Sequence, residues 1–411
     1  MTRSRVVIAP DKFKGSLTAP EVAAHVARGI EAAVPGVITD EVPVADGGDG
    51  TVDAAVAAGY RRVEVSVRGP AGDPVTASFA ISGDVAVIES AQACGLERLP
   101  GGRRLPLTAT SHGVGELIAA AAGRGAHRIV LGLGGVATTD GGAGLVSALG
   151  GRLLDAGGRD IAPGGAALAG VRTLDLTGLR DLSGLEVILA SDVDNPLLGP
   201  DGAAAVYGPQ KGASDADVPV LDAGLARWAD VAEAALAGVG PGAPGGAGPG
   251  GGGPGGGGPG AARAGGGTPV RFRDRAGAGA AGGLGFAALA FLNARMRPGI
   301  DVLLELLSFG RRVAGASLVI TGEGSLDAQT LRGKAPAGVA RATRAASPGT
   351  PVVAVAGRCS LDAGLLTGAG LAGAYALSDI EPDVAASMAN AGPLLEKLAQ
   401  QVATDWLAPP R

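Results

Sequence analysis

The chain has 411 residues and a formal net charge of −5. This length favours two domains over a single core, and the acidic balance excludes the basic face that a nucleic-acid partner requires. Cys94 and Cys359 lie far apart and outside any zinc-binding spacing, which excludes a disulfide framework and a structural zinc site. The first apolar run is too short for a signal peptide or a membrane span, so we expect a cytoplasmic protein with no membrane partner.

The N-terminal region repeats the order of strand, loop and helix. Residues 6–9 are an apolar run typical of a buried strand, and Thr18 and Glu21 have the spacing of a capping box that begins a helix. Residues 42–44 and 51–58 repeat this order around a glycine-rich loop. The repeat predicts a parallel sheet with helices on its faces.

Residues 61–89 have a different pattern, in which short alternating segments are separated by Gly-Pro and Gly-Asp turns. This pattern predicts antiparallel or mixed strands and a domain boundary near Gly69. Alternation of strands and helices then resumes. The expected strands are 129–133, 187–191, 318–321, 352–356 and 372–377, and the expected helices are 114–122, 142–149, 336–346 and 393–406.

Together these patterns predict an α/β fold with two domains, one of which is discontinuous in sequence. We expect residues 1–68 and 290–411 to form the first domain and residues 69–289 to form an inserted second domain. Within the second, eighteen of the thirty residues 238–267 are glycine and five are proline. Such a segment cannot bury enough apolar surface to offset its ordering entropy, which predicts a disordered loop without a catalytic role.

Three loops place acidic residues among glycines, and each of these loops follows a short apolar run. They are residues 46–50, residues 140–142 and residues 322–327. Glycine amides can approach a phosphate closely, and neighbouring carboxylates can hold Mg²⁺ or orient an attacking hydroxyl. A single loop of this kind is explained by a tight turn that caps a helix. Three at strand ends indicate phosphoryl transfer.

Lysine usage supports the same chemistry. All but five of the 34 basic residues are arginine, yet Lys12, Lys14, Lys211 and Lys334 all lie in loops rich in glycine, proline or aspartate. The compact ammonium group of lysine suits neutralisation of a phosphate. For any one of these four lysines, the alternative is that it is an exposed loop residue without a function.

The common nucleotide motifs are incomplete in this chain. Gly132, Gly134 and Ala137 match a dinucleotide fingerprint after a strand, but five residues intervene before the helix. A Walker A loop is absent because Ala335 follows Lys334 where Ser or Thr is required. An ATP site in this chain is therefore expected to be of a less common kind.

Seven ordered motifs, spread over nearly the whole chain, resemble those of the type I glycerate kinase family. They are residues 9–16, 44–51, 134–144, 192–197, 208–213, 277–285 and 322–334. The resemblance implies a flavodoxin-like domain with a doubly wound parallel sheet and a second, mixed α/β domain. It also implies Mg²⁺-dependent phosphorylation of D-glycerate by ATP. Val136 and Thr139 depart from the serine and asparagine usual in the family, which bears on substrate range.

The expected reaction is therefore transfer of phosphate from ATP to D-glycerate, giving 2-phosphoglycerate. Phosphorylation at the other hydroxyl, or of a related small hydroxy acid, is the alternative product. A noncatalytic, nucleotide-responsive binding protein is the alternative of another class, and a nicotinamide dehydrogenase is the third. A homodimer is an open option for the assembly.

Each candidate residue has an expected role. Asp192, at the end of strand 187–191, is the expected general base, with an Asn-Pro turn as its structural alternative. Glu323 and Asp327 are expected to bind the metal, or else to cap the following helix. The residues expected to neutralise charge are Lys12, Lys211 and Lys334, and those expected to bind substrate or phosphate are Asp46, Gly47, Gly48, Asp49, Asp140, Asn195, Gly279, Gly282 and Gly283.

Overall fold

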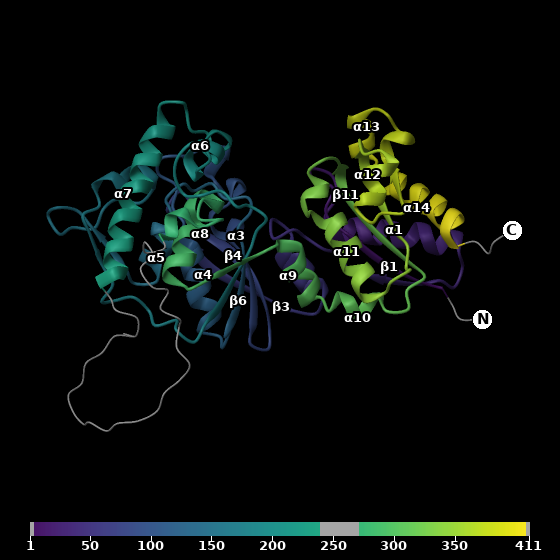
Figure 1. The fold of residues 1–411 in the computed structure, drawn as a ribbon, viewed down its shortest axis with the longest axis horizontal. Helices are drawn as coiled ribbons and strands as arrows, with labels where there is room; N and C mark the ends of the chain where they lie inside the picture. The colour runs from purple at the N-terminus through teal and green to yellow at the C-terminus, as the bar shows by residue number, and fades with distance from the viewer. Residues whose placement is uncertain (1–3, 239–270, 408–411) are drawn as a thin grey trace, which may run out of the picture.

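The computed structural model describes residues 4–238 and 271–407. The chain forms two lobes, each built on its own sheet, with helix α9 (Gly299–Leu306) between them (Figure 1). Both ends of the chain lie on the same lobe. Nearly all of the predicted loop 238–267 lies outside the described residues.

The first lobe contains a five-stranded parallel sheet in the order β13-β12-β11-β1-β2. Counted along the chain, this is the 2-1-3-4-5 order of flavodoxin-like folds, so the predicted architecture is confirmed. Its strands are β1 (Arg5–Pro10), β2 (Ile38–Glu41), β11 (Leu318–Leu326), β12 (Val352–Cys359) and β13 (Gly373–Ala376). Strand β2 lies slightly before the predicted residues 42–44, which continue beside β1 through single hydrogen bonds.

Helices cover both faces of this sheet. Alternate residues of β1 point to opposite faces, so Val6 and Ile8 pack with α1 and α14, while Val7 and Ala9 face α9, α10 and α11. The capping box of Thr18 and Glu21 is present at the start of α1. The helices are α1 (Ala19–Ala33), α10 (Phe309–Val313), α11 (Ala335–Ala346), α12 (Ala363–Gly368), α13 (Val384–Ala389) and α14 (Ala391–Leu407).

The second lobe contains a six-stranded mixed sheet in the order β10-β9-β6-β5-β4-β3. Its first four members are parallel, whereas β4 and β3 are antiparallel, as the alternating pattern predicted. The strands are β3 (Arg61–Arg68), β4 (Pro74–Ser82), β5 (Val85–Glu89), β6 (Arg128–Gly132), β9 (Glu186–Ala190) and β10 (Arg295–Arg297).

Two strands differ from the predicted domain division. Residues 1–68 and 290–411 were expected in the first domain, but β3 and β10 pair within the six-stranded sheet. The reason for β3 is that Val63 and Val67 bury their side chains in the same core as Phe79. Division by sheet therefore places the boundaries near residues 60 and 298.

Helix α2 (Thr51–Ala57) and helix α9 lie between the two sheets. Val52 and Val302 pack on the six-stranded sheet, while Ala54 and Leu303 belong to the core of the first lobe. The other face of the six-stranded sheet carries the remaining helices. Strands β7 (Arg152–Leu154) and β8 (Thr173–Asp175) form a small separate two-stranded sheet. These helices are α3 (Ser90–Cys94), α4 (His112–Ala122), α5 (Ala143–Ala148), α6 (Ala203–Tyr207), α7 (Asp217–Gly238) and α8 (Ala280–Phe291).

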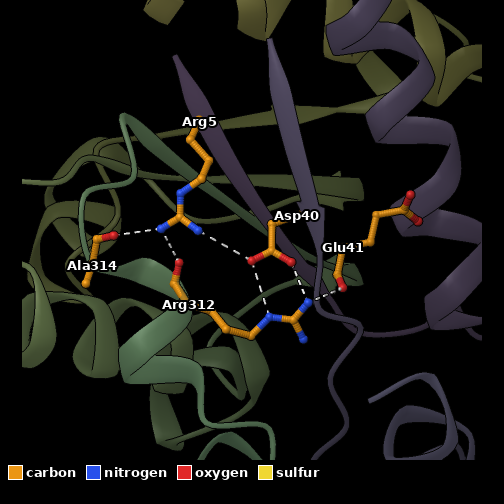
Figure 2. Close-up of polar contacts among 5 residues, drawn as sticks. All are labelled: Arg5, Asp40, Glu41, Arg312 and Ala314. Atoms are coloured by element: carbon orange, nitrogen blue, oxygen red, sulfur yellow. Dashed lines mark hydrogen bonds and ion pairs between the residues drawn. The ribbon is translucent and has the colours of Figure 1, made fainter. Parts of the chain in front are cut away.

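A polar network joins segments that are far apart in sequence (Figure 2). The Arg5 guanidinium, on β1, donates hydrogen bonds to the carbonyl oxygens of Arg312, at 2.5 Å, and Ala314, at 2.7 Å. Asp40 on β2 accepts from the Arg312 guanidinium and lies 3.6 Å from that of Arg5. The network therefore fixes the first two strands to helix α10.

None of the helices in the described part of the chain combines the length and the apolar character that a bilayer crossing needs.

Candidate active site

A cleft of about 720 Å³ opens at the carboxyl ends of the five-stranded sheet. Asp11 follows β1, Asp46 lies in the loop after β2, and Glu323 lies near the carboxyl end of β11. Open α/β sheets place their ligands at this edge, because the loops after neighbouring parallel strands converge there. The polar lining residues of the cleft include Asp11, Lys12, Lys14, Asp46, Gly48, Asp49, Glu323, Ser325, Lys334 and Arg358.

Three carboxylates lie close together in the cleft. Burial, together with the charge of Asp46, raises the pKa of Asp11 to about 7, although Lys12 opposes this shift. Burial also raises the pKa of Glu323, which accepts a hydrogen bond from the Thr330 hydroxyl. Because these carboxyl groups repel one another in a partly desolvated site, the cleft favours a bound cation or proton.

Two lysines lie among these carboxylates. Lys12 Nζ donates to the carbonyl oxygen of Asp49 at 2.5 Å and lies 3.9 Å from its carboxylate. Lys334 Nζ lies 3.9 Å from Glu323 Oε2. The side chains are 27% and 34% exposed, respectively, so both ammonium groups can reach a polyanion in the cleft.

The loop of residues 46–49 is held tightly from two sides. Gly47 has φ +89°, and a Cβ there would lie 2.5 Å from the carbonyl oxygen of Ala190 at the end of β9. A Cβ on Gly299, at the start of α9, would lie 1.9 Å from the carbonyl oxygen of Asp46. Only glycine fits at these two contacts, so the loop presents its backbone in one fixed position.

The carboxylate of Glu89, at the end of β5, binds the start of the helix that follows this loop. Its Oε1 accepts a hydrogen bond from the amide of Val52, at the start of α2, at 2.5 Å. Burial raises the pKa of Glu89 to about 7. Glu89 therefore ties the six-stranded sheet to the helix that follows the loop.

Asp192 lines a second, smaller hollow of about 450 Å³, which we call the Asp192 hollow. Its Oδ1 accepts from the amide of Gly299 at 3.2 Å. Burial, with a further contribution from Asp46, raises the pKa of Asp192 to about 6. Arg297 and Arg341 line the same hollow, where each guanidinium is partly engaged, with Glu305 and Asp301 respectively.

The cleft and the Asp192 hollow adjoin. Gly333 lines the Asp192 hollow while its neighbour Lys334 lines the cleft. Asp46 lines the cleft and yet affects the ionisation of Asp192. Two ligands bound in the two hollows would therefore meet near Asp46 and Lys334.

Other predicted site residues form a buried cluster in the second lobe. Asp140 is 1% exposed and accepts four hydrogen bonds, two from Ser111 and one each from the amides of Gly142 and Gly144. Burial raises its pKa, although these donors oppose the shift. Its oxygens are thus occupied by the protein's own donors, and it does not line the cleft.

Lys211 belongs to this buried cluster. Its Nζ donates to the carbonyl oxygen of Thr138 at 2.6 Å, and burial lowers its pKa to about 8. Gly282 and Gly283 have φ values of +67° and +87°, and a Cβ on Gly282 would lie 1.9 Å from the same carbonyl oxygen. This geometry joins two loops of the second lobe and leaves none of the three residues on the cleft.

The remaining predicted residues make local turns. The side-chain amide nitrogen (Nδ2) of Asn195 donates to the carbonyl oxygen of Asp201 at 2.8 Å, and a Cβ on Gly279 would lie 2.2 Å from the carbonyl oxygen of Pro196. Asp327 accepts from the amide of Gln329 at 2.8 Å and contributes to the raised pKa of Glu323. Within residues 4–238 and 271–407, no group of three or more His, Cys, Asp or Glu side chains is arranged to hold a metal ion by itself.

Sequence reasoning missed several residues that line the hollows. Asp11 stands directly after the first strand, beside Lys12, and this position was the signal that could have identified it. Arg297 and Arg341 come together only through the fold, from β10 and α11. The apolar lining from Val384 and Met388 likewise had no local sequence signal.

The chain matches the model of the glycerate kinase family over residues 6–267 and 260–407. It belongs to the glycerate kinase family. A protein of Bacillus subtilis (strain 168) named glycerate kinase is 43% identical over 403 residues, 97% of each chain. A protein of Escherichia coli (strain K12) named glycerate 2-kinase is 41% identical over 367 residues, 88% of this chain and 87% of the relative.

The fold of a solved structure agrees with this family membership. A crystal structure described as "putative glycerate kinase 2" from Salmonella typhimurium LT2 matches with a TM-score of 0.78 and 38% identity, over 98% of each chain. The resemblance to glycerate kinases in the sequence is therefore confirmed, and the protein is a kinase.

Proposed function

We propose that the protein transfers the terminal phosphoryl group of ATP to D-glycerate and releases 2-phosphoglycerate. The observation that carries this proposal is the pairing of a cleft holding Lys12 and Lys334 with an adjoining hollow holding Asp192. The relative named glycerate 2-kinase supports the choice of product. We expect the reaction in the cytoplasm, where ATP is supplied.

The nucleotide phosphates would lie in the cleft. Lys12 and Lys334 would neutralise the charge that spreads over the transferring group, and the loop of Gly47 and Gly48 would let phosphate oxygens approach its backbone closely. Of these two glycines Gly48 lines the cleft, and its amide donates to Asp46 Oδ1 at 3.2 Å. The loop is held in place by its packing between β9 and α9. Positioning and electrostatics supply most of the catalysis in phosphoryl transfer, so this rigidity is useful.

The carboxylates of the cleft fit a magnesium ion. Asp11, Asp46 and Glu323 offer hard oxygen donors that repel one another, and Asp327 lies close enough to influence Glu323. Proteins hold Mg²⁺ through one or two carboxylates together with substrate phosphates and water, and a complete protein cage is not needed. When bound, the ion neutralises charge on the phosphates.

Glycerate would occupy the Asp192 hollow. Arg297 and Arg341 have donors to spare beyond their acidic partners and would bind the substrate carboxylate. Asp192 would accept the proton of the attacking hydroxyl, since its pKa of about 6 leaves it ionised yet basic near neutral pH. The phosphoryl group would pass near Lys334, where the two hollows adjoin.

The buried cluster receives a supporting role in this proposal. Lys211, Asp140, Gly282 and Gly283 would hold the loops of the second lobe in shape, and they would not touch phosphate. Asn195 and Gly279 would fix the turn that follows Asp192. A homodimer remains compatible with this arrangement.

The test is an assay of the purified protein with ATP, Mg²⁺ and a panel of small hydroxy acids. Release of ADP that requires D-glycerate is expected, with NMR showing phosphate on C2 of the product and with little turnover in EDTA. Phosphate on C3 would instead identify a 3-kinase. Nucleotide binding without ADP release for any acid would favour the noncatalytic binding protein, and turnover undiminished by EDTA would refute the magnesium assignment.

A further inference from the structure

The lining of the cleft changes character along the edge of the five-stranded sheet. The residues that follow β2, β1 and β11 are charged, whereas those that follow β13 are largely apolar. Val384 and Met388 are 68% and 44% exposed, respectively, although both line the cleft. We call this surface the apolar wall; it consists of Leu377, Pro382, Val384, Met388 and Ala391.

The apolar wall is held in place by the residues around it. Asp383 caps helix α13 by accepting a hydrogen bond from the amide of Ala386 at 2.7 Å. The hydroxyl of Ser16 donates to the carbonyl oxygen of Met388 at 3.0 Å. Gly15 has φ +79°, and a Cβ there would lie 3.2 Å from Met388 Cε. Contacts within the protein therefore hold helix α13 and Met388 in position.

Large exposed apolar side chains inside a cleft indicate a ligand with an apolar part. Glycerate cannot be that ligand, because each of its three carbons bears oxygen and it has no apolar face to bury. A nucleoside triphosphate does match, since it has a flat, weakly polar base at one end and a polyanion at the other. Neighbouring strands lie about 4.8 Å apart, so β11 and β13 are separated by roughly 10 Å. This span suits a nucleotide with its phosphates near Glu323 and its base beyond them.

We propose that the apolar wall binds the base of the nucleotide. This assignment rests on the proposed function and adds to it the direction in which the nucleotide lies. The phosphates extend from the wall toward Lys12 and Lys334, and the base packs on Val384 and Met388. Methionine adapts its shape to a flat ring, and Ser378 and Glu381, which also line the cleft, supply polar groups beside the base.

The experiment measures binding by calorimetry in the absence of glycerate, with ATP and with inorganic tripolyphosphate. The first has a base and the second has none, so tripolyphosphate probes the charged part of the cleft alone. In Val384→Asp we expect ATP affinity to fall at least tenfold while tripolyphosphate affinity stays within twofold. The matched control is Ile380→Asp, because Ile380 is 40% exposed on the same segment and does not line the cleft. That control should bind both ligands as the wild type does.

Equal loss of both ligands in Val384→Asp, or unchanged ATP binding, would overturn the proposal. A measurement on the wild type avoids any dependence on the variant's folding: ATP should bind at least tenfold more tightly than tripolyphosphate, and equal affinities would also overturn the proposal. Failure of the proposed function gives a different result. In that case the base-dependent binding would persist while no glycerate is phosphorylated, whereas a wrong base site would leave glycerate turnover intact and the ATP KM of Val384→Asp unchanged.

Discussion

The Asp46 loop and the Asp140 loop share one sequence pattern and have opposite environments. In each, an acidic residue is followed by two glycines in the loop after a strand, Asp46 after β2 and Asp140 after β6. Asp46 lines the open cleft and accepts one hydrogen bond, from the amide of Gly48 at 3.2 Å. Asp140 is buried and accepts four. The pattern therefore identifies a tight turn after a strand, and the donors around the carboxylate decide whether it is available to a ligand.

The lysines show the same division. Lys12 and Lys334 lie in the cleft near carboxylates, whereas Lys211 is 3% exposed and bonded to a backbone carbonyl. We therefore distinguish an open side, the residues that line the cleft or the Asp192 hollow, from a buried side, the cluster around Asp140 and Lys211. Substitutions on the open side are expected to change turnover, and substitutions on the buried side are expected to change stability.

The largest expected effect is at Asp192, on the open side. Asn keeps the hydrogen bond from Gly299 but cannot accept a proton, so we expect Asp192→Asn to lower kcat by roughly 10²–10⁴ with little change in glycerate KM. Wild-type kcat should fall as the pH drops below about 6, because protonation of Asp192 removes the base. Steady-state kinetics across pH and a melting curve test both statements.

Other roles of Asp192 would give other results in that experiment. If Asp192 were a metal ligand, higher Mg²⁺ or Mn²⁺ would partly restore the activity of the variant. If it were only a turn residue, the variant would melt earlier and turn over normally.

A substitution of Gly282, on the buried side, and of Gly333, on the open side, tests how tightly the backbone is packed in each place. Both Gly282 and Gly333 have positive φ, but a Cβ on Gly282 would lie 1.9 Å from the carbonyl oxygen of Thr138, whereas a Cβ on Gly333 would meet nothing within 4 Å. Gly333→Ala should cost about 1–2 kcal/mol from its backbone conformation alone. Gly282→Ala should cost considerably more, since the backbone must also move. Chemical denaturation of both variants measures the difference, and equal costs would contradict the confinement of Gly282.

Asp46→Asn and Asp140→Asn form a matched pair that tests the comparison directly. In Asp140→Asn the amide group must face a protein donor, and each buried donor left unsatisfied costs about 1–3 kcal/mol. We expect its melting temperature to fall by about 2–6 °C, with ATP affinity preserved once folded. Asp46→Asn should melt within about 2 °C of the wild type and lose turnover. A stable Asp140→Asn that fails to bind ATP would place Asp140 in the site and break the comparison.

The smallest expected effect concerns Glu89, which connects the six-stranded sheet to helix α2. Because its pKa is raised from 4.5 to about 7 in the folded protein, the native state holds a proton that the unfolded chain releases over this range. The resulting stabilisation is complete below about pH 4.5 and is lost as the pH rises through about 7. The wild-type melting temperature should therefore fall more steeply across this range than that of Glu89→Gln, which keeps an acceptor for Val52. Parallel curves for the two proteins would argue against a titrating Glu89.

The fold was predictable to the extent that its signals are local. Apolar runs such as residues 318–321 and the capping box at Thr18 predicted their elements because each depends on neighbouring residues. The boundary at β3 was missed because Val63 and Val67 gain their burial from Phe79 and the helices beyond it. Lys12 and Glu323 could be predicted to line a cleft because each stands near the end of a parallel strand. Lys211 could not be placed, since its burial depends on loops that the sequence does not bring together.

The long-range pairing of the first strand has a consequence for how the protein is made. Ala9 accepts a hydrogen bond from the hydroxyl of Thr321, 312 positions later in the chain, and β1 has β11 as one of its two neighbours. The six-stranded sheet, by contrast, is built entirely from residues 61–297. During synthesis the inserted lobe can therefore fold first, at a time when the apolar residues 6–9 have β2 available but not yet their other neighbour, β11. We expect this interval to be the step at which the nascent chain is most prone to aggregate and most dependent on chaperones.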